Sequence, residues 1–157
     1  MHSKILLSLL LTTLATATHA LSLSIPKAII DSAVAAKFPK EKFSLKLDQP
    51  STRFIKEAQK IELCGKWSTK LPQKTGDFCI DFRPQWRKVS GDIELSQVNI
   101  LKLSLGDDKL LPAAIAATLN SSLLMLLDGA SIYHVPDFVG KHVERIEVQE
   151  GSFSLVF

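Results

Sequence analysis

The residues of this sequence best placed for covalent chemistry are Cys64 and Cys79, its only two cysteines. Each lies in a segment that alternates apolar and polar residues, as a strand does. Pro72 and Gly76 lie between the two segments and favour a turn. If the segments pair as an antiparallel hairpin with Cys64 opposite Cys79, apolar residues gather on one face and charged residues share the other face with the cysteines. A shift of one residue would destroy this separation, so the register is well specified.

This register predicts a structural disulfide between Cys64 and Cys79. The further pairs that it predicts are Leu63 with Ile80, Ile61 with Phe82, and Gly65 with Phe78. The cysteines are too far apart in the chain for the Cys-x-x-Cys pattern of redox and metal sites, and no other ligands accompany them. An oxidising compartment would keep such a pair bonded. We therefore expect a disulfide here and no metal.

The remaining reactive side chains form no recognisable catalytic or metal site. His142 and Glu144 would share one face of a strand, but a third metal ligand is missing. The sequence contains no Gly-x-Ser-x-Gly motif, no phosphate loop and no glycine-rich dinucleotide turn. We therefore predict that the protein is not an enzyme, and we assign it no catalytic residue, no metal and no cofactor.

The N-terminal segment has the layout of a secretory signal peptide. Lys4 precedes an uncharged, leucine-rich run, and Ala20 closes a small-residue cleavage pattern. The run is short for a membrane anchor, which is the alternative. No cysteine precedes Cys64, so the segment lacks the residue that a lipoprotein signal needs. We expect a signal peptide over residues 1–20 and one domain over residues 21–157, released as a soluble periplasmic protein.

The charge distribution is uneven although the total charge is small. The formal net charge of +3 over 157 residues is too low for a typical nucleic-acid-binding protein. Basic residues nevertheless outnumber acidic ones by ten to four between Lys37 and Lys74. This basic region could face an anionic membrane surface. The simpler alternative is that strands direct their lysines into solvent.

A long uncharged stretch, Leu110–Leu127, predicts a very apolar helix. Polar residues in its middle and acidic flanks argue against a transmembrane span. A helix that is apolar on most of its circumference must be shielded from water on most sides. A curved sheet could provide all of the cover, or an apolar ligand could cover the side that the sheet leaves open. The residues expected to pack on the sheet are Leu119, Leu123 and Leu126. Those expected to contact a ligand are Leu110, Ala117, Leu124 and Met125, with Leu103 of the preceding strand.

The rest of the chain alternates between strand and helix patterns. Apolar residues at helical spacing follow Ser24, a long β segment covers Val89–Leu105, and two strands close the chain around Val143–Val148 and Ser152–Phe157. The order predicts an α+β domain, with a strongly curved antiparallel sheet wrapped around the long apolar C-terminal helix and a shorter N-terminal helix.

This order of elements, together with several short motifs, resembles the YceB-like family of small bacterial envelope proteins of unknown function. The motifs are Leu110-Leu111-Pro112, Leu119-Asn120-Ser121-Ser122-Leu123 and Ile146-Glu147-Val148 before Gly151. The resemblance implies half of a tubular lipid-binding (TULIP-like) module that binds a lipid or another apolar small molecule in the periplasm. Typical members are lipoproteins, whereas this chain lacks the lipidation cysteine, and the Cys64–Cys79 pair is not expected in the family.

Two other functions fit parts of the sequence. A structural or partner-binding envelope protein would have a filled core, or a groove that holds a protein segment. The alternating C-terminus Phe153–Phe157 resembles the sorting signal of an outer-membrane β-barrel, but the uncharged helix leaves too few residues for the strands of a small barrel. The sequence points to no particular partner protein or oligomeric state.

Overall fold

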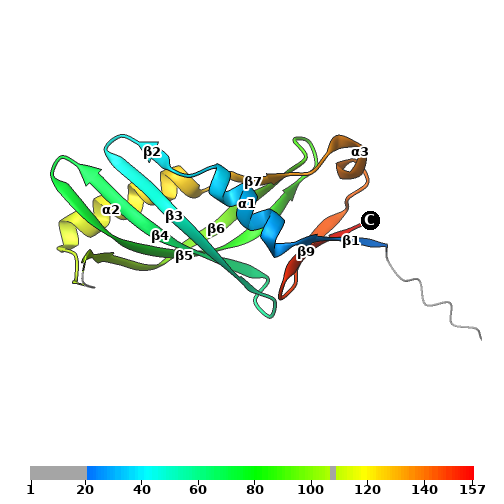
Figure 1. Cartoon of the computed structure of the whole chain (residues 1–157), viewed down its shortest axis with the longest axis horizontal. Coiled ribbons are helices and arrows are strands. Elements are labelled where there is room, and N and C mark those ends of the chain that lie inside the picture. Colours follow the sequence, from blue (N-terminus) through cyan, green and yellow to red (C-terminus); the bar gives the residue numbers. More distant parts are fainter. Residues whose placement is uncertain (1–20, 107–108) are drawn as a thin grey trace, which may run out of the picture.

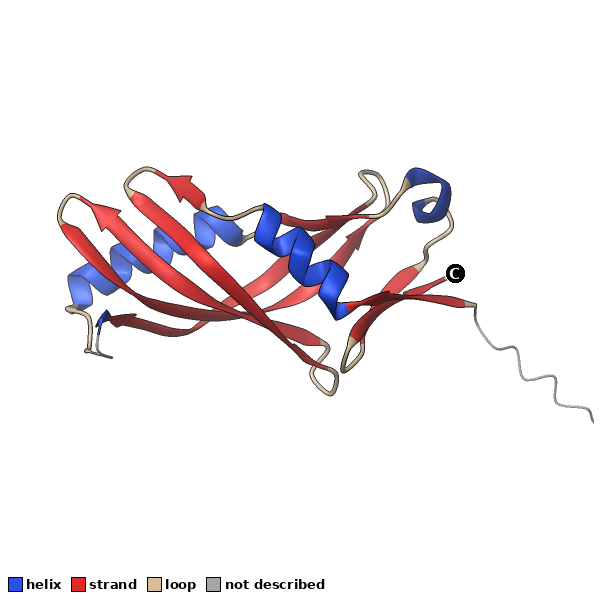
Figure 2. Cartoon of the chain, viewed as in Figure 1, coloured by secondary structure: helices blue, strands red, loops and turns tan. Residues whose placement is uncertain are grey.

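Strands form most of this protein. The computed structural model describes residues 21–106 and 109–157, so the predicted signal peptide at residues 1–20 lies outside the described residues. Strands account for 54% of the structure and helices for 22%. Figure 1 shows the elements in sequence order, and Figure 2 shows a broad sheet with helices along it.

Two antiparallel sheets make up the fold. The larger has the order β2-β3-β4-β5-β6-β7, with β2 (Lys40–Lys42), β3 (Leu45–Ile55), β4 (Lys60–Lys70), β5 (Gln73–Arg87), β6 (Asp92–Leu105) and β7 (Ser131–His134). The smaller has the order β1-β9-β8, with β1 (Ser22–Pro26), β8 (Arg145–Val148) and β9 (Ser152–Val156). The helices are α1 (Lys27–Ala36), α2 (Ala113–Leu127) and α3 (Asp137–Gly140).

The larger sheet is strongly curled. Its register shifts between Asp48 and Ser51 of β3 and at two places in β5, and such bulges bend and twist a strand. The curl brings distant strands of the sheet to the same helix, because α2 contacts both β2 and β6 while α1 contacts both β3 and β7. Figure 1 shows both helices running along the curled strands. The helices therefore bridge strands from the two sides of the curl.

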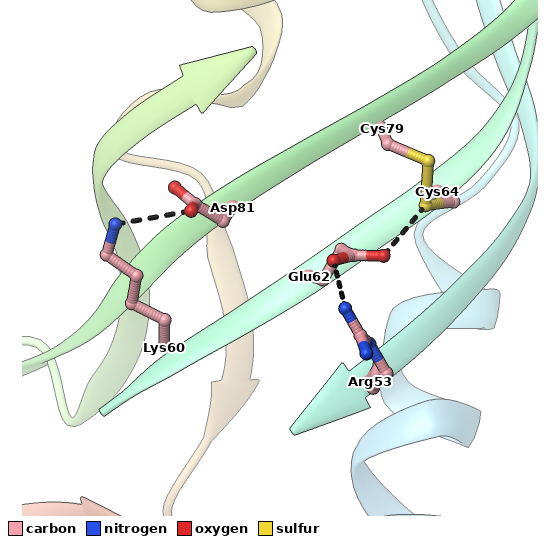
Figure 3. A network of polar contacts seen from close by, with 6 residues as sticks. All are labelled: Arg53, Lys60, Glu62, Cys64, Cys79 and Asp81. Atoms are coloured by element: carbon pink, nitrogen blue, oxygen red, sulfur yellow. Dashed lines mark hydrogen bonds and ion pairs between the residues drawn. A yellow bond between two sulfur atoms is a disulfide. The ribbon is translucent and has the colours of Figure 1, made fainter. Parts of the chain in front are cut away.

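The predicted register of the cysteine hairpin is confirmed. Strands β4 and β5 pair Cys64 with Cys79, and the three other pairs predicted from the sequence also lie opposite each other. The apolar partners are buried, and the cysteines form a disulfide. The disulfide lies on the polar face of the sheet, near an ion pair between Arg53 and Glu62 at 2.7 Å (Figure 3). Ion pairs at such exposed sites contribute little stability, so the buried apolar face and the disulfide stabilise this hairpin.

Removing the disulfide should lower stability without abolishing the fold. The bond joins residues 15 positions apart, and closing a loop of this length stabilises a fold by about 3 kcal/mol on the chain-entropy model. We expect the double variant Cys64→Ser, Cys79→Ser to lose about that much free energy of unfolding in urea, because the buried face of the hairpin is unchanged. Thiol titration of the denatured natural protein should find no free thiol, and two free thiols would contradict the assignment.

The predicted fold class is wrong. The protein is mostly β rather than α+β, and the apolar segment forms a helix of only 15 residues because Leu110–Pro112 stay outside it. Only one face of α2 is buried, through Leu119, Leu123 and Leu127. Large side chains of the sheet, such as Phe78, share one hydrophobic core with this face of α2, so one face of a short helix completes the core. Within the described residues, no helix has the length and apolarity to cross a membrane.

The smaller sheet packs against the far end of the larger one. Phe54 of β3 stacks on Phe153 of β9, with 5.0 Å between ring centroids. The side-chain amide of Gln59 donates to the carbonyl oxygen of Val148 at 3.0 Å and accepts from its backbone N–H at 2.8 Å. The sequence placed the start of the first helix after Ser24, but Ser22–Pro26 form β1, which pairs with β9, and α1 begins only at Lys27.

Candidate functional site

An apolar groove opens where α2 meets one end of the larger sheet. In an antiparallel meander, alternate turns fall at the same end, so the β2–β3 and β4–β5 turns lie together there. The groove has a volume of about 380 Å³. The residues that line it are Phe43, Ser44, Leu45, Trp67, Thr69, Leu71, Pro72 and Lys74 from the sheet, and Ala114, Ile115, Thr118, Leu119 and Ser122 from α2. Two turns and one helix therefore supply its walls.

Buried apolar residues form the deep part of the groove. Leu45 of β3, Trp67 of β4 and Leu119 of α2 are almost fully buried, yet each contributes to the lining. The indole Nε1 of Trp67 donates a hydrogen bond to the carbonyl oxygen of Ser104 at 3.0 Å. This bond satisfies the only polar group of the ring and fixes its orientation. The groove therefore has a rigid aromatic base.

The rim carries exposed apolar side chains and one basic residue. Phe43 is 76% exposed and Leu71 is 88% exposed. The hydroxyl groups of Thr69 and Thr118 donate to backbone carbonyl oxygens, at 2.7 Å and 3.2 Å, so they present mainly their methyl groups. Among the described residues, Lys74 has no ion-pair partner. The groove thus combines apolar walls with one free cation.

The sequence correctly identified part of the packed face of α2 but not the groove. Leu119 and Leu123 are buried and Leu126 is partly buried, as expected. The five predicted ligand contacts do not line the groove: Ala117, Leu124 and Met125 lie on the exposed face of α2, Leu110 is exposed before the helix begins, and Leu103 is partly buried in β6. The α2 residues that do line the groove are Ala114 and the residues one, four, five and eight positions after it, which are Ile115, Thr118, Leu119 and Ser122.

The groove could not be located from the sequence because its walls come from distant segments. Phe43 and Leu71 each occupy a turn, and nothing local indicates that these turns meet the first half of α2. The available signal was the chemical type of these residues, because large apolar side chains are unusual in tight turns, which favour glycine, proline and small polar residues. Neither residue was singled out in the sequence.

Clusters of titratable groups lie outside the groove and form no catalytic arrangement among the described residues. Nδ1 of the exposed His134 lies 3.1 Å from Oδ1 of Asp92. Burial would raise the pKa of Asp92, but hydrogen bonds from His134, Ser90 and Ser131 outweigh this effect and lower the pKa. His142 and Glu144 precede β8 rather than sharing a strand, so the alternation expected for them is absent.

The candidate metal ligands among the described residues also form no usable site. Within the described ranges, the one group of three candidate side chains consists of Glu62 with Cys64 and Cys79. Both sulfur atoms are bonded to each other and offer no thiolate, which is the form that binds a metal. The contact of 3.6 Å between Cys64 Sγ and Glu62 Oε1 (Figure 3) likewise contains no thiol proton to donate.

No family model matches this sequence, and no curated protein matches it significantly.

Proposed function

We propose that this protein is an exported, non-enzymatic binding protein that holds the hydrocarbon chain of a lipid or another apolar molecule in the groove between α2 and the larger sheet. One observation carries this proposal: apolar walls with a fixed aromatic base remain open to solvent. An apolar ligand that covers this surface removes it from water, which lowers the free energy.

The size and charge of the groove indicate the class of ligand. A volume of about 380 Å³ lies at the lower end of the range of small-molecule sites, roughly 300 to 1,000 Å³. The groove therefore suits one chain rather than several. Each methylene group moved from water into it would contribute about 0.8 kcal/mol. Lys74 at the mouth would attract a carboxylate or phosphate at the end of that chain.

Two further observations support the location and the class. The Cys64–Cys79 disulfide is consistent with an oxidising compartment, and the N-terminal sequence pattern favours export to the periplasm. The resemblance to the YceB-like family, which rests on the short sequence motifs alone, would imply the same class of ligand. We therefore propose the periplasm as its location.

A single substitution on α2 should block the groove. Ala114 lines it, whereas Ala117 lies on the exposed side of the same helix. Ala114→Phe would place a ring in the groove, and Ala117→Phe would place the same ring in solvent. We expect Ala114→Phe to weaken binding of a fluorescent fatty acid at least about tenfold, because a ring that displaces two methylenes removes roughly 1.6 kcal/mol. Ala117→Phe should bind as the natural protein does.

Thermal unfolding of both variants provides the control, since both positions are exposed and neither change should alter the melting temperature by much. If the natural protein takes up no apolar probe, the proposal fails and a structural or partner-binding role replaces it. If Ala117→Phe weakens uptake while Ala114→Phe does not, the ligand binds to the outer face of α2.

A further inference from the structure

We propose that the end of the molecule formed by the β2–β3 and β4–β5 turns docks on an anionic phospholipid membrane. Phe43 and Leu71 would insert among the lipid headgroups, and the neighbouring lysines would contact the phosphates. This inference concerns an interaction surface, and it does not require an occupied groove. It gives a specific site to one of the two interpretations of the basic region between Lys37 and Lys74, namely contact with an anionic membrane surface.

The first support is the placement of the exposed apolar residues. Phe43 and Leu71 each occupy a turn, and both turns lie at the same end of the sheet. A single exposed apolar residue needs no explanation. Two large ones on neighbouring turns form an exposed apolar surface, and its contact with water is unfavourable. Apolar side chains at this position can enter the interfacial layer of a membrane while the rest of the domain stays in water.

The second support is the backbone of Phe43. Its φ of 58° lies in the left-handed region, which bulky residues rarely occupy. The side chain is also 76% exposed, so little core packing compensates for this conformation. Asparagine or glycine would suit the turn better. The turn therefore carries a residue that is unfavourable for the isolated fold, as expected of a residue retained for contact with another surface.

The third support is the charge around the two turns. Lys40 and Lys42 precede the β2–β3 turn, and Lys70 and Lys74 flank the β4–β5 turn. Glu41, which lies between the first two lysines, pairs with Lys70 at 2.6 Å. The hydrogen bond from Lys70 and its charge lower the pKa of Glu41, so this pair is neutral as a unit. Two of the remaining cations flank the apolar tips directly: Lys42 Nζ lies 5.6 Å from the centroid of the Phe43 ring, and Lys74 shares the groove lining with Leu71.

The rest of the surface explains why this end is favoured. The opposite end also exposes apolar residues, Val89 and Phe138, but the exposed Asp137 precedes Phe138 directly. We therefore assign the membrane contact to the two turns alone.

Docking in this orientation would give the groove a direct supply of ligand. Phe43, Leu71 and Lys74 belong both to the proposed contact and to the groove lining. A membrane bound at the turns would therefore touch the mouth of the groove, and an acyl chain could move between the two without crossing water.

Vesicle flotation of the purified protein tests this inference. We expect it to float with vesicles of phosphatidylcholine and phosphatidylglycerol but not with phosphatidylcholine alone, and to dissociate as salt is raised. Phe43→Asn should weaken partitioning about tenfold, because the ring no longer enters the interface. The double variant Lys42→Gln, Lys74→Gln should weaken it about thirtyfold, from the attraction of two lysines to an anionic surface.

Matched variants at the opposite end serve as controls. Phe138→Asn removes an equally exposed ring, and Lys56→Gln with Lys88→Gln removes two exposed lysines. Both controls should float as the natural protein does. Phe43→Asn should also melt at the same temperature as the natural protein or higher, because asparagine relieves the unfavourable turn conformation. A loss of membrane binding without a loss of stability would separate docking from a folding role.

Several results would overturn the inference: no flotation with either vesicle, equal flotation with both, or equal losses in Phe43→Asn and Phe138→Asn. Binding of the fluorescent fatty acid in the absence of vesicles is measured separately. A protein that binds the probe but no vesicles would refute docking and leave the proposed function intact. A protein that binds vesicles but no probe would support docking and refute the proposed function.

Discussion

Replacing Gly76 with alanine is expected to cost about 3 kcal/mol of folding free energy or more, at the upper end of what an added methyl group does in a packed interior. Gly76 lies opposite Trp67 in the β4–β5 hairpin and opposite Leu105 in the neighbouring pair. A Cβ atom at Gly76 would overlap the backbone carbonyl oxygen of Ser104 and lie 2.6 Å from Trp67 Nε1.

The effect should be large because neither neighbour can move at low cost. The carbonyl oxygen of Ser104 belongs to the backbone of β6, and Trp67 is buried with its indole hydrogen-bonded to that same oxygen. Displacing the indole would leave a buried donor without a partner, which itself costs about 1 to 3 kcal/mol. It would also disturb the base of the groove.

Urea unfolding of Gly76→Ala and Gly106→Ala provides the comparison. A Cβ atom at Gly106 would meet nothing within 4 Å, so this control should stay close to the natural protein. Similar unfolding midpoints for Gly76→Ala and the natural protein would show that Trp67 is not held in the arrangement described.

The second large effect is expected at Leu123. This side chain is 0% exposed and faces the sheet, whereas the next residue, Leu124, is 37% exposed on the outer side of α2. We expect Leu123→Asn to lower the free energy of unfolding by at least about 3 kcal/mol, because it leaves a cavity and buries an unpaired amide. Leu124→Asn should change it by no more than about 0.5 kcal/mol.

Calorimetry and fatty-acid uptake together distinguish the two faces of the helix. Leu124→Asn should retain full uptake, because Leu124 does not line the groove. This expectation differs from the sequence-based assignment of Leu124 and Met125 to the ligand side. Equal melting temperatures for Leu123→Asn and Leu124→Asn would contradict the orientation of α2.

The cysteine hairpin shows what the sequence can predict about this fold. Two short segments with clear alternation allow only one register that pairs the cysteines and buries Ile61, Leu63 and Ile80 together. The information is local, and a slip of one residue reverses the two faces. The two closing strands expected around Val143–Val148 and Ser152–Phe157 are also present, as β8 and β9, which pair with each other.

The role of α2 was harder to predict because composition does not report what surrounds a helix. The uncharged segment indicated which residues pack on the sheet, such as Leu119 and Leu123, but not what covers the other side of the helix. The deciding quantity is the curl of the sheet, which depends on bulges such as the one near Gln49, where φ is 52°. Pro50, a residue type that usually ends a strand, lies inside β3 at this bulge.

The central claim is that the groove beside Trp67 holds an apolar chain, and tryptophan quenching tests it most directly. Trp86→Phe leaves Trp67 as the single tryptophan. This variant should fold normally, because the buried Trp86 Nε1 has no hydrogen-bond partner among the described residues. Titration with a brominated fatty acid should quench Trp67 emission saturably, and Ala114→Phe in the same background should remove the effect. Saturable binding of the fatty acid that leaves Trp67 emission unchanged would contradict the claim.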